Sequence, residues 1–339
     1  MTTAPTINRR WLLAARPEGL VDARCFRLVE EPVPEPAADG ELVVRVEFLS
    51  IDPTQRGWIS RDTYMPAVPL GEVVRSFGAG TVVASRHPGF TVGDRVSGLL
   101  GWQDYARVDG RTAALLTKIP PGVPLELALN VLGLNGLTAY FGLLEVGRPV
   151  AGETVVVSGA AGATGSIAGQ IAKLHGCRVV GIAGGRAKCD WLLNEARFDA
   201  AIDYKTESIR ERLGALCPDG VDVFFDNVGG EALDAVLALL RKRGRIALCG
   251  AISQYSDDEP PPGPRNLTNL IIRSGRMEGF LLSDFRDRIP QAIPVLAGWV
   301  AAGKLVARVD VLDGLERAPE ALRRLFTGEN VGKQLVKVA

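Results

Sequence analysis

The sequence predicts an α/β protein that contains a Rossmann doubly wound parallel sheet. Two observations predict it: a glycine-rich turn at Gly159–Gly165, and a regular alternation of short apolar runs with helical patterns beyond that turn. Strands that are apolar throughout are expected where helices cover both faces of a sheet. Repeated strand–helix units then imply parallel strands joined by right-handed crossovers.

The first unit of this sheet is a strand, a glycine turn and a helix. The apolar run Glu153–Ser158 precedes the turn, and the helical pattern Ser166–Leu174 follows it. Glycines let the backbone turn tightly and approach a pyrophosphate, whose charge then faces the N–H groups of the helix N-terminus. Further strands are expected at 177–183, 200–204, 221–225 and 245–249, and helices at 187–196, 207–216 and 231–241.

The end of the second strand indicates which dinucleotide the site accepts. An NAD site usually carries an Asp or Glu about 20 residues after the glycine turn, to bind the ribose 2′-hydroxyl. Here the chain reads Ala183-Gly184-Gly185-Arg186-Ala187-Lys188, with two cations and no acid. Arg186 or Lys188 would pair with a 2′-phosphate, although such cations also suit the solvated first turn of a helix. Together with the missing acid, they favour NADPH.

The first part of the chain has a different pattern. Strand-like runs at 42–48 and 80–84 are separated by turns rich in Pro and Gly, which is typical of short antiparallel strands. We therefore expect a β-barrel-type domain at 1–125. The segment 306–339 ends in one further strand, which is expected to return to this first domain.

The Rossmann domain is expected to occupy residues 126–305. A long helical region at 125–146 is expected to lead into it. The loop Asp257–Pro264 contains four prolines, three of them in a row. It is expected to form a stiff, exposed excursion near the dimer or substrate side.

Composition excludes several classes of partner. Lys and Arg together number 39, as do Asp and Glu, so the zero net charge does not favour nucleic acid or an anionic membrane. The uncharged stretch 154–172 has the length of a membrane span, but its glycines divide it into a strand and a helix. The apolar run after Arg9-Arg10 ends too early for an export signal, so a cytoplasmic location is expected.

Cysteine and histidine usage predicts no metal site. The five cysteines are never spaced as Cys-x-x-Cys, and the two histidines are His87 and His175. Neither a disulfide framework nor a zinc site is expected from this pattern. The chemistry is therefore expected to come from the cofactor.

Motifs along nearly the whole chain resemble one family. They are Asn8–Trp11, Leu49–Pro53, Gly101–Tyr105, Gly136–Tyr140, Asp203–Lys205, Phe225–Gly230, Cys249–Tyr255 and Gly328–Lys333. In these motifs the chain resembles the zinc-independent medium-chain dehydrogenases/reductases, and within them the prostaglandin reductase, 2-alkenal reductase and curcumin reductase group. The resemblance implies a GroES-like catalytic domain beside the Rossmann domain, and usually a homodimer. It also implies NADPH-dependent, metal-free reduction of a carbon–carbon double bond conjugated to a carbonyl.

The resemblance also implies which residues form the cofactor site. They are Gly162, Ala163, Thr164, Gly165, Gly184, Lys188, Tyr204, Asn227, Cys249, Ala251, Ile252, Ser253, Tyr255, Phe280, Leu281, Leu282 and Asn330. The glycine turn would hold the pyrophosphate, and Lys188 and Tyr204 would contact the 2′-phosphate. The segment 249–255 would line the ribose and nicotinamide. Phe280–Leu282 would border the nicotinamide, and Asn330 would reach it from the C-terminal segment.

Tyr255 is the catalytic residue that the resemblance implies. Hydride would pass from C4 of the nicotinamide to the β-carbon of the enone, while negative charge develops on the carbonyl oxygen. A positioned hydroxyl can stabilise that enolate or assist its protonation. The alternative is that the Tyr255 ring only packs against the cofactor.

One position departs from the group's pattern. The group usually reads Asp-Pro-Tyr-Met-Arg-Gly where this chain has Asp52-Pro53-Thr54-Gln55-Arg56-Gly57. The tyrosine missing at Thr54 lines the substrate pocket in relatives, so the pocket is expected to be larger and more polar here. Tyr64 is a second catalytic candidate that would supply a pocket phenol instead, unless it is a surface aromatic.

Two other functions remain open. One is an NADPH quinone oxidoreductase on the same scaffold. The other is an NADPH-binding protein without catalytic activity, against which Tyr255 beside an intact cofactor motif argues.

Overall fold

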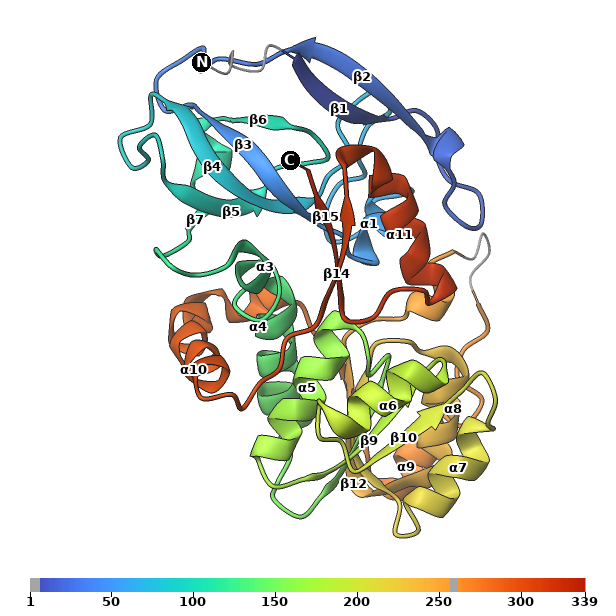
Figure 1. The fold of residues 1–339 in the computed structure, drawn as a ribbon. Coiled ribbons are helices and arrows are strands. Elements are labelled where there is room, and N and C mark those ends of the chain that lie inside the picture. The colour runs from blue at the N-terminus through green and yellow to red at the C-terminus, as the bar shows by residue number, and fades with distance from the viewer. Residues whose placement is uncertain (1–6, 257–260, 339) are drawn as a thin grey trace. The chain divides into compact units, whose positions relative to one another are not determined.

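The computed structural model describes residues 7–256 and 261–338, which fall into two units (Figure 1). Unit 1 comprises residues 1–129 and 309–339, and unit 2 comprises residues 130–308. The sequence placed these divisions at 125/126 and 305/306. In the structure the first boundary comes later, after residue 129. The reason is packing, because helix α3 (Leu125–Ala128) buries its side chains against Ile119 and Leu335 of unit 1.

Unit 2 is built on a parallel sheet with the order β10-β9-β8-β11-β12-β13 among the described residues. Its strands are β8 (Thr154–Ser158), β9 (Arg178–Ala183), β10 (Ala200–Asp203), β11 (Val221–Asp226), β12 (Leu240–Leu248) and β13 (Arg276–Gly279). All neighbouring strands pair in parallel. Strand order reverses between β8 and β11, and in open parallel sheets ligands bind outside the carboxyl ends of the strands at such a point.

Helices cover both faces of this sheet (Figure 1). They are α5 (Ala163–Leu174), α6 (Arg186–Asn194), α7 (Ile209–Leu216), α8 (Gly230–Leu239) and α9 (Asn269–Arg273). A further helix of this unit, α10 (Ile289–Ala301), packs against α4 (Leu134–Phe141). Val180 and Ile182 of β9 belong to the apolar cluster that α7 and α8 cover. Gly181 between them faces α6 instead, since a Cβ there would lie 2.9 Å from Leu192. The predicted Rossmann fold is confirmed.

The long helical region expected at 125–146 is helical in the structure but is interrupted between residues 128 and 134. The chain forms α3, then α4 (Leu134–Phe141), then a π-helical turn η2 (Gly142–Gly147). The break is a tight turn in which the Asn130 carbonyl accepts hydrogen bonds from the N–H groups of Gly133 and Gly136. A Cβ on Gly136 would overlap the Val131 carbonyl, so this turn depends on glycine.

Unit 1 is largely antiparallel, in agreement with the β-rich first domain that the sequence predicted. Its main sheet has the order β14-β15-β3-β4-β5-β7, with β6 paired to β3. Its elements are β1 (Ile7–Leu13), η1 (Ala23–Cys25), β2 (Phe26–Pro32), β3 (Leu42–Ser50), α1 (Thr54–Trp58), β4 (Phe77–Ser85), β5 (Arg95–Leu99), β6 (Tyr105–Val108), α2 (Gly110–Ala113), β7 (Thr117–Lys118), β14 (Val309–Asp313), η5 (Leu315–Arg317), α11 (Ala318–Thr327) and β15 (Lys333–Lys337). The last strand, β15, pairs antiparallel with β3.

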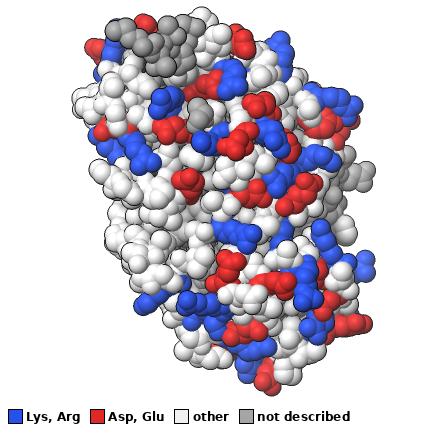
Figure 2. Space-filling view, viewed as in Figure 1, with Lys and Arg blue, Asp and Glu red and all other residues white. Residues whose placement is uncertain are grey.

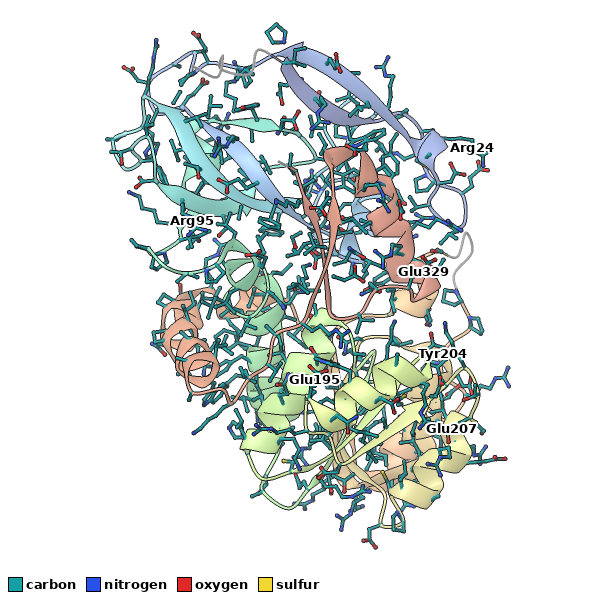
Figure 3. The ribbon with its side chains drawn as sticks, viewed as in Figure 1. Arg24, Arg95, Glu195, Tyr204, Glu207 and Glu329 are labelled. Atoms are coloured by element: carbon teal, nitrogen blue, oxygen red, sulfur yellow. The ribbon has the colours of Figure 1, made fainter. Side chains whose placement is uncertain are left out.

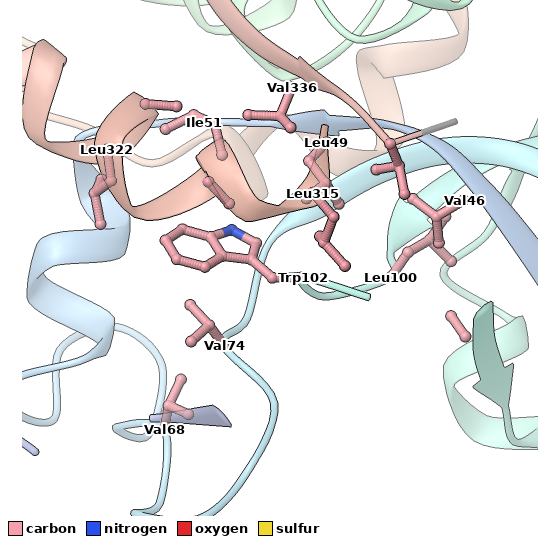
Figure 4. Close-up of a cluster of buried hydrophobic side chains, with 14 of the residues drawn as sticks. Val46, Leu49, Ile51, Val68, Val74, Leu100, Trp102, Leu315, Leu322 and Val336 are labelled. Carbon is pink, nitrogen blue, oxygen red and sulfur yellow. The ribbon is translucent and has the colours of Figure 1, made fainter. Parts of the chain in front are cut away.

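The core of unit 1 joins segments that are distant in the sequence. Trp102 is fully buried and lies among Val74, Leu315 and Leu322 (Figure 4). The last two belong to the C-terminal segment. Burying each such side chain stabilises the fold by about 1.5–3 kcal/mol, so this segment is integral to unit 1.

Charges of both signs are interspersed over the face of the molecule that Figure 2 shows. This distribution accords with the net charge of zero. No helix among the described residues is long and apolar enough to cross a membrane.

Candidate active site

The glycine turn exposes a helix N-terminus at the carboxyl end of β8. Gly159 has a φ of +56°, in the left-handed region, and a Cβ on Gly165 would overlap the Gly159 carbonyl oxygen. Both positions therefore require glycine. Gly162 is the N-cap of α5 and supplies no side-chain cap. The N–H groups of Ala163–Gly165 thus lack helical partners, and N–H groups in this position are the ones that bind anions at helix N-termini.

Gly184 follows the carboxyl end of β9, and Tyr204, which is labelled in Figure 3, follows the carboxyl end of β10. The two residues come together there. A Cβ on Gly184 would lie 2.8 Å from the Tyr204 ring, and Tyr204 is 49% exposed. Lys188 lies in the first turn of α6, which begins directly after these glycines. Lys188 and Tyr204, the two residues expected to contact the 2′-phosphate, therefore share one corner of the sheet with Gly184.

Two acidic side chains near this corner already have partners within the protein. Asp203 accepts the Gly185 N–H at 2.7 Å, and hydrogen bonds from the backbone hold the pKa of this carboxyl below its usual value. Arg186 pairs with Asp190 at 3.3 Å within α6. The sequence analysis named Asp203 only within the motif Asp203–Lys205 and gave it no role, although it could have been noticed as the acid that ends an apolar strand.

Asn227 follows β11 and contacts the glycine turn. Its Nδ2 donates to the Ser158 carbonyl at 2.7 Å, and its Cβ lies 3.4 Å from where a Cβ of Gly159 would be. Ser158 and Asp226, which end β8 and β11, are fully buried polar residues that the sequence analysis missed.

Tyr255 lies at the end of the segment that follows β12. This segment includes the short turn η3 (Ile252–Gln254), which contains Ser253 and ends at Tyr255. The Tyr255 hydroxyl accepts the Ala251 N–H at 3.1 Å, which fixes the phenol oxygen. Cys249 is partly exposed as a residue, yet burial of its sulfur raises the pKa of the thiol to about 12. Cys249 is therefore a thiol at neutral pH and no nucleophile.

A cavity of about 430 Å³ lies beside Tyr255. Its walls are mainly apolar and include Leu233, Leu248, Met277 and Pro261–Pro264. The volume lies within the range of small-molecule sites. The described end of the predicted proline-rich loop thus lines this cavity, whereas residues 257–260 of that loop lie outside the described residues.

Phe280 follows β13 and packs closely against η2. A Cβ on Gly142 would overlap the Phe280 ring, and the ring lies edge-on to Phe225 at 6.4 Å. Leu281 is exposed, and Leu282 begins the 3-10 helix η4 (Leu282–Arg288). The ring of Phe280 is therefore held by two elements of unit 2, η2 and β11, while the next residue, Leu281, is exposed.

Thr54 and Tyr64 belong to unit 1 and hydrogen-bond to each other. Their hydroxyl oxygens lie 2.8 Å apart, and the Tyr64 ring packs edge-on against Trp58. Surrounding protein atoms raise the pKa of the Tyr64 phenol, and the Thr54 hydrogen bond opposes that rise. Although Tyr64 is 55% exposed, its phenol is thus fixed by the threonine that replaces the group's tyrosine.

Asn330 also belongs to unit 1, where its Nδ2 donates to the Gly332 carbonyl at 3.0 Å. Next to it, the Lys333 ammonium lies 2.5 Å from Asp52 and donates to the Ile51 carbonyl. Both charged side chains are buried, and burial lowers the pKa of Lys333 while Asp52 opposes that shift. This ion pair, which the sequence analysis missed, joins β15 to the loop before α1.

A doubly wound sheet with a glycine turn at its carboxyl edge, joined to a largely antiparallel unit, defines a dehydrogenase/reductase fold. Residues 9–116 match a family described as N-terminal domain of oxidoreductase, and residues 163–298 match one described as zinc-binding dehydrogenase. The chain belongs to the medium-chain dehydrogenase/reductase family, in its zinc-independent group, which confirms the resemblance read from its motifs.

Relatives of known sequence and structure are similar over nearly the whole chain. A putative NADP-dependent oxidoreductase, YfmJ of Bacillus subtilis (strain 168), is 46% identical over 96% of each chain. The NADPH-dependent curcumin reductase of Escherichia coli (strain K12) is 41% identical over 98% of this chain and 97% of its own. The crystal structure of CurA from Vibrio vulnificus in complex with NADPH has a TM-score of 0.92 at 40% identity, covering 98% of this chain and 99% of its own.

One of these families is described as zinc-binding, but the described part of this chain contains no set of zinc ligands. No group of three or more His, Cys, Asp or Glu side chains there could hold a metal ion.

Proposed function

We propose that this protein is an NADPH-dependent reductase of carbon–carbon double bonds conjugated to a carbonyl. The observation that carries the proposal is the carboxyl edge of the unit 2 sheet. There an uncapped helix N-terminus adjoins a corner with Tyr204 and Lys188, and no acid stands between Ala183 and Lys188. Relatives at about 40% identity, namely a curcumin reductase and a tobacco 2-alkenal reductase, support the choice of substrate class.

The described residues fit a dinucleotide that carries a 2′-phosphate. The N–H groups of Ala163–Gly165 would hold the pyrophosphate. Because Gly165 has no Cβ, the helix N-terminus can pack directly against Gly159, and this tight turn brings those N–H groups to the carboxyl end of β8. Lys188 and Tyr204 would hold the 2′-phosphate, since the segment Ala183–Lys188 carries no carboxylate to repel it. The remaining predicted residues, from Asn227 to Asn330, would contact the ribose and nicotinamide. When bound, NADPH supplies the hydride.

Tyr255 would act on the carbonyl oxygen of the substrate. Reduction at the β-carbon leaves negative charge on that oxygen, and a phenol can donate a hydrogen bond or a proton to it. The backbone hydrogen bond from Ala251 holds the Tyr255 oxygen in place, so the donor is preorganised. Tyr64, held by Thr54, would be the second phenol.

The proposal extends to assembly and location. Resemblance to the group supports a homodimer in the cytoplasm, with residues 1–125 and 306–339 as the catalytic domain and 126–305 as the cofactor domain. Light scattering checks the assembly, since a dimer has twice the 36.2 kDa mass of the chain.

The function is tested by NADPH consumption with three acceptors: a 2-alkenal, a benzylideneacetone-type enone and a quinone. The proposal predicts turnover of the alkenal or the enone, and slower reaction with NADH. Turnover of the quinone alone would assign the quinone oxidoreductase activity instead. Tight NADPH binding without turnover of any acceptor would leave a binding protein.

A further inference from the structure

Ser158 and Asp226 form a buried polar pair at the point where strand order reverses. They end β8 and β11, and both are fully buried. The Ser158 hydroxyl donates to Asp226 Oδ1 at 2.6 Å. The same oxygen accepts the N–H groups of Val228 and Gly229, each at 3.0 Å. With three donors on one oxygen, Asp226 anchors the turn that follows β11.

This anchored turn touches both halves of the proposed cofactor edge. On one side, Asn227 donates its N–H to the Ser158 hydroxyl at 2.8 Å, and its Nδ2 donates to the carbonyl of Ser158, the residue before Gly159, at 2.7 Å. On the other side, the Asp226 carbonyl accepts the Cys249 N–H at 2.8 Å. The turn therefore joins the glycine turn to the segment that follows β12.

Hydrogen bonds continue from this turn toward Tyr255. The Ile252 N–H donates to the Asn227 carbonyl at 3.2 Å, and the Ser253 hydroxyl donates to the Val228 carbonyl at 2.6 Å. Both donors belong to η3, which ends at Tyr255. Displacing the turn would thus displace the tyrosine segment.

The second carboxylate oxygen of Asp226, Oδ2, takes no part in these hydrogen bonds, and this suggests a conservative substitution that tests the anchor. Oδ2 is buried and accepts no hydrogen bond from the described residues, and burial raises the pKa of this carboxyl. Asparagine has nearly the same shape and keeps an acceptor oxygen at the Oδ1 position. It should therefore replace Asp226 if acceptance of the three hydrogen bonds is what matters.

We propose that Asp226 and Ser158 are positioning residues, which set the Tyr255 segment relative to the glycine turn. Asp226 borders the cavity beside Tyr255, but both side chains are fully buried, so they act through the turn and not on cofactor or substrate. This inference rests on the proposed function. A misplacement of about 1 Å at a reacting centre can cost a hundredfold in rate. Loss of the anchor should therefore affect the nicotinamide half of the cofactor and spare the adenosine half.

The test compares Asp226→Ala with Asp222→Ala. Asp222 lies on the same strand at the opposite edge of the sheet, and it also accepts a hydrogen bond from β8, the Thr154 N–H at 2.9 Å. Calorimetry gives the dissociation constants for NADPH and for adenosine 2′,5′-bisphosphate, and heating gives the unfolding midpoint of each variant. Asp226→Ala should weaken NADPH binding about tenfold and bisphosphate binding less than twofold, and lower kcat for an enone at least tenfold. Asp222→Ala should lower only the unfolding midpoint.

Two further variants keep the inference testable if Asp226→Ala does not fold. Asp226→Asn should restore the ratio of the two dissociation constants, and Ser158→Ala should shift it in the same direction as Asp226→Ala, by less. If the unchanged protein reduces no enone, the proposed function fails, but the two dissociation constants still decide this inference. An unchanged ratio in Asp226→Ala and Ser158→Ala, or an equal shift in Asp222→Ala, would overturn it.

Discussion

The two units hold their candidate functional residues by different means. In unit 2 the residues follow strand ends, and backbone geometry sets their positions, as the space around Gly165 and the hydrogen bonds to Asp226 show. In unit 1 the Thr54–Tyr64 pair is held by side-chain contacts, and its segment is joined to the last strand by the buried Lys333–Asp52 ion pair. We therefore expect the function of unit 2 to be most sensitive to a Cβ added where the backbone is tightly packed. We expect the stability of unit 1 to be most sensitive to the loss of single side chains.

The largest expected effect is in unit 1. Lys333→Ala leaves the buried Asp52 carboxylate without its partner, and should cost about 3–5 kcal/mol of the free energy of unfolding of this unit. Urea denaturation measures it. The matched control is Lys118→Ala, since Lys118 pairs with Asp94 at 2.7 Å on the surface of the same unit and should contribute about 1 kcal/mol or less. Equal losses of unfolding free energy in the two variants would contradict the claim that the buried ion pair matters more to stability than the surface pair.

The next effect belongs to unit 2 and to the space around one glycine. Gly165→Ala forces a Cβ against the Gly159 carbonyl oxygen, and should weaken NADPH binding about a hundredfold, or about 2.7 kcal/mol. Fluorescence titration measures it. Gly298 of α10 has open space around its Cβ position, so Gly298→Ala should leave NADPH affinity unchanged. Tight binding by Gly165→Ala would show that the backbone there can shift.

A smaller effect separates chemistry from binding in unit 2. Tyr255→Phe removes the hydroxyl and should lower turnover about tenfold to a hundredfold, while the dissociation constant for NADPH changes less than twofold. Tyr204→Phe should do the reverse and weaken NADPH binding with little change in kcat. Steady-state kinetics and titration distinguish them. Unchanged rates in Tyr255→Phe would remove this phenol from the mechanism.

The smallest effect concerns the hydroxyl pair of unit 1. Thr54→Val removes the hydrogen bond to Tyr64, a neutral bond that contributes about 1 kcal/mol, and should raise KM for an enone about threefold to fivefold. Tyr64→Phe should act on the same interaction. The double variant should then resemble either single variant, and additive effects on KM would show that the two residues act separately.

The same contrast explains what the sequence could predict. Strands β8–β12 of unit 2 and the residues after them were predictable, because apolar runs and glycine turns are local signals. Strand β13 was not predicted, because its four residues include Arg276 and Glu278 and form no apolar run. Three features were not: the break at Asn130–Gly133, the Ser158–Asp226 pair and the Lys333–Asp52 ion pair. The pairs join positions 68 and 281 residues apart, and nothing local marks such partners. The Thr54–Tyr64 hydrogen bond likewise depends on how the loop between them folds.

The central claim is that hydride reaches the β-carbon of a conjugated enone. It is tested most directly with NADPH that carries deuterium at C4, on the face that the enzyme uses, and with benzylideneacetone as acceptor. Nuclear magnetic resonance of the product locates the label. We expect the saturated ketone, with deuterium on its β-carbon. Deuterium on the carbonyl carbon of an unsaturated alcohol would contradict the proposed reaction.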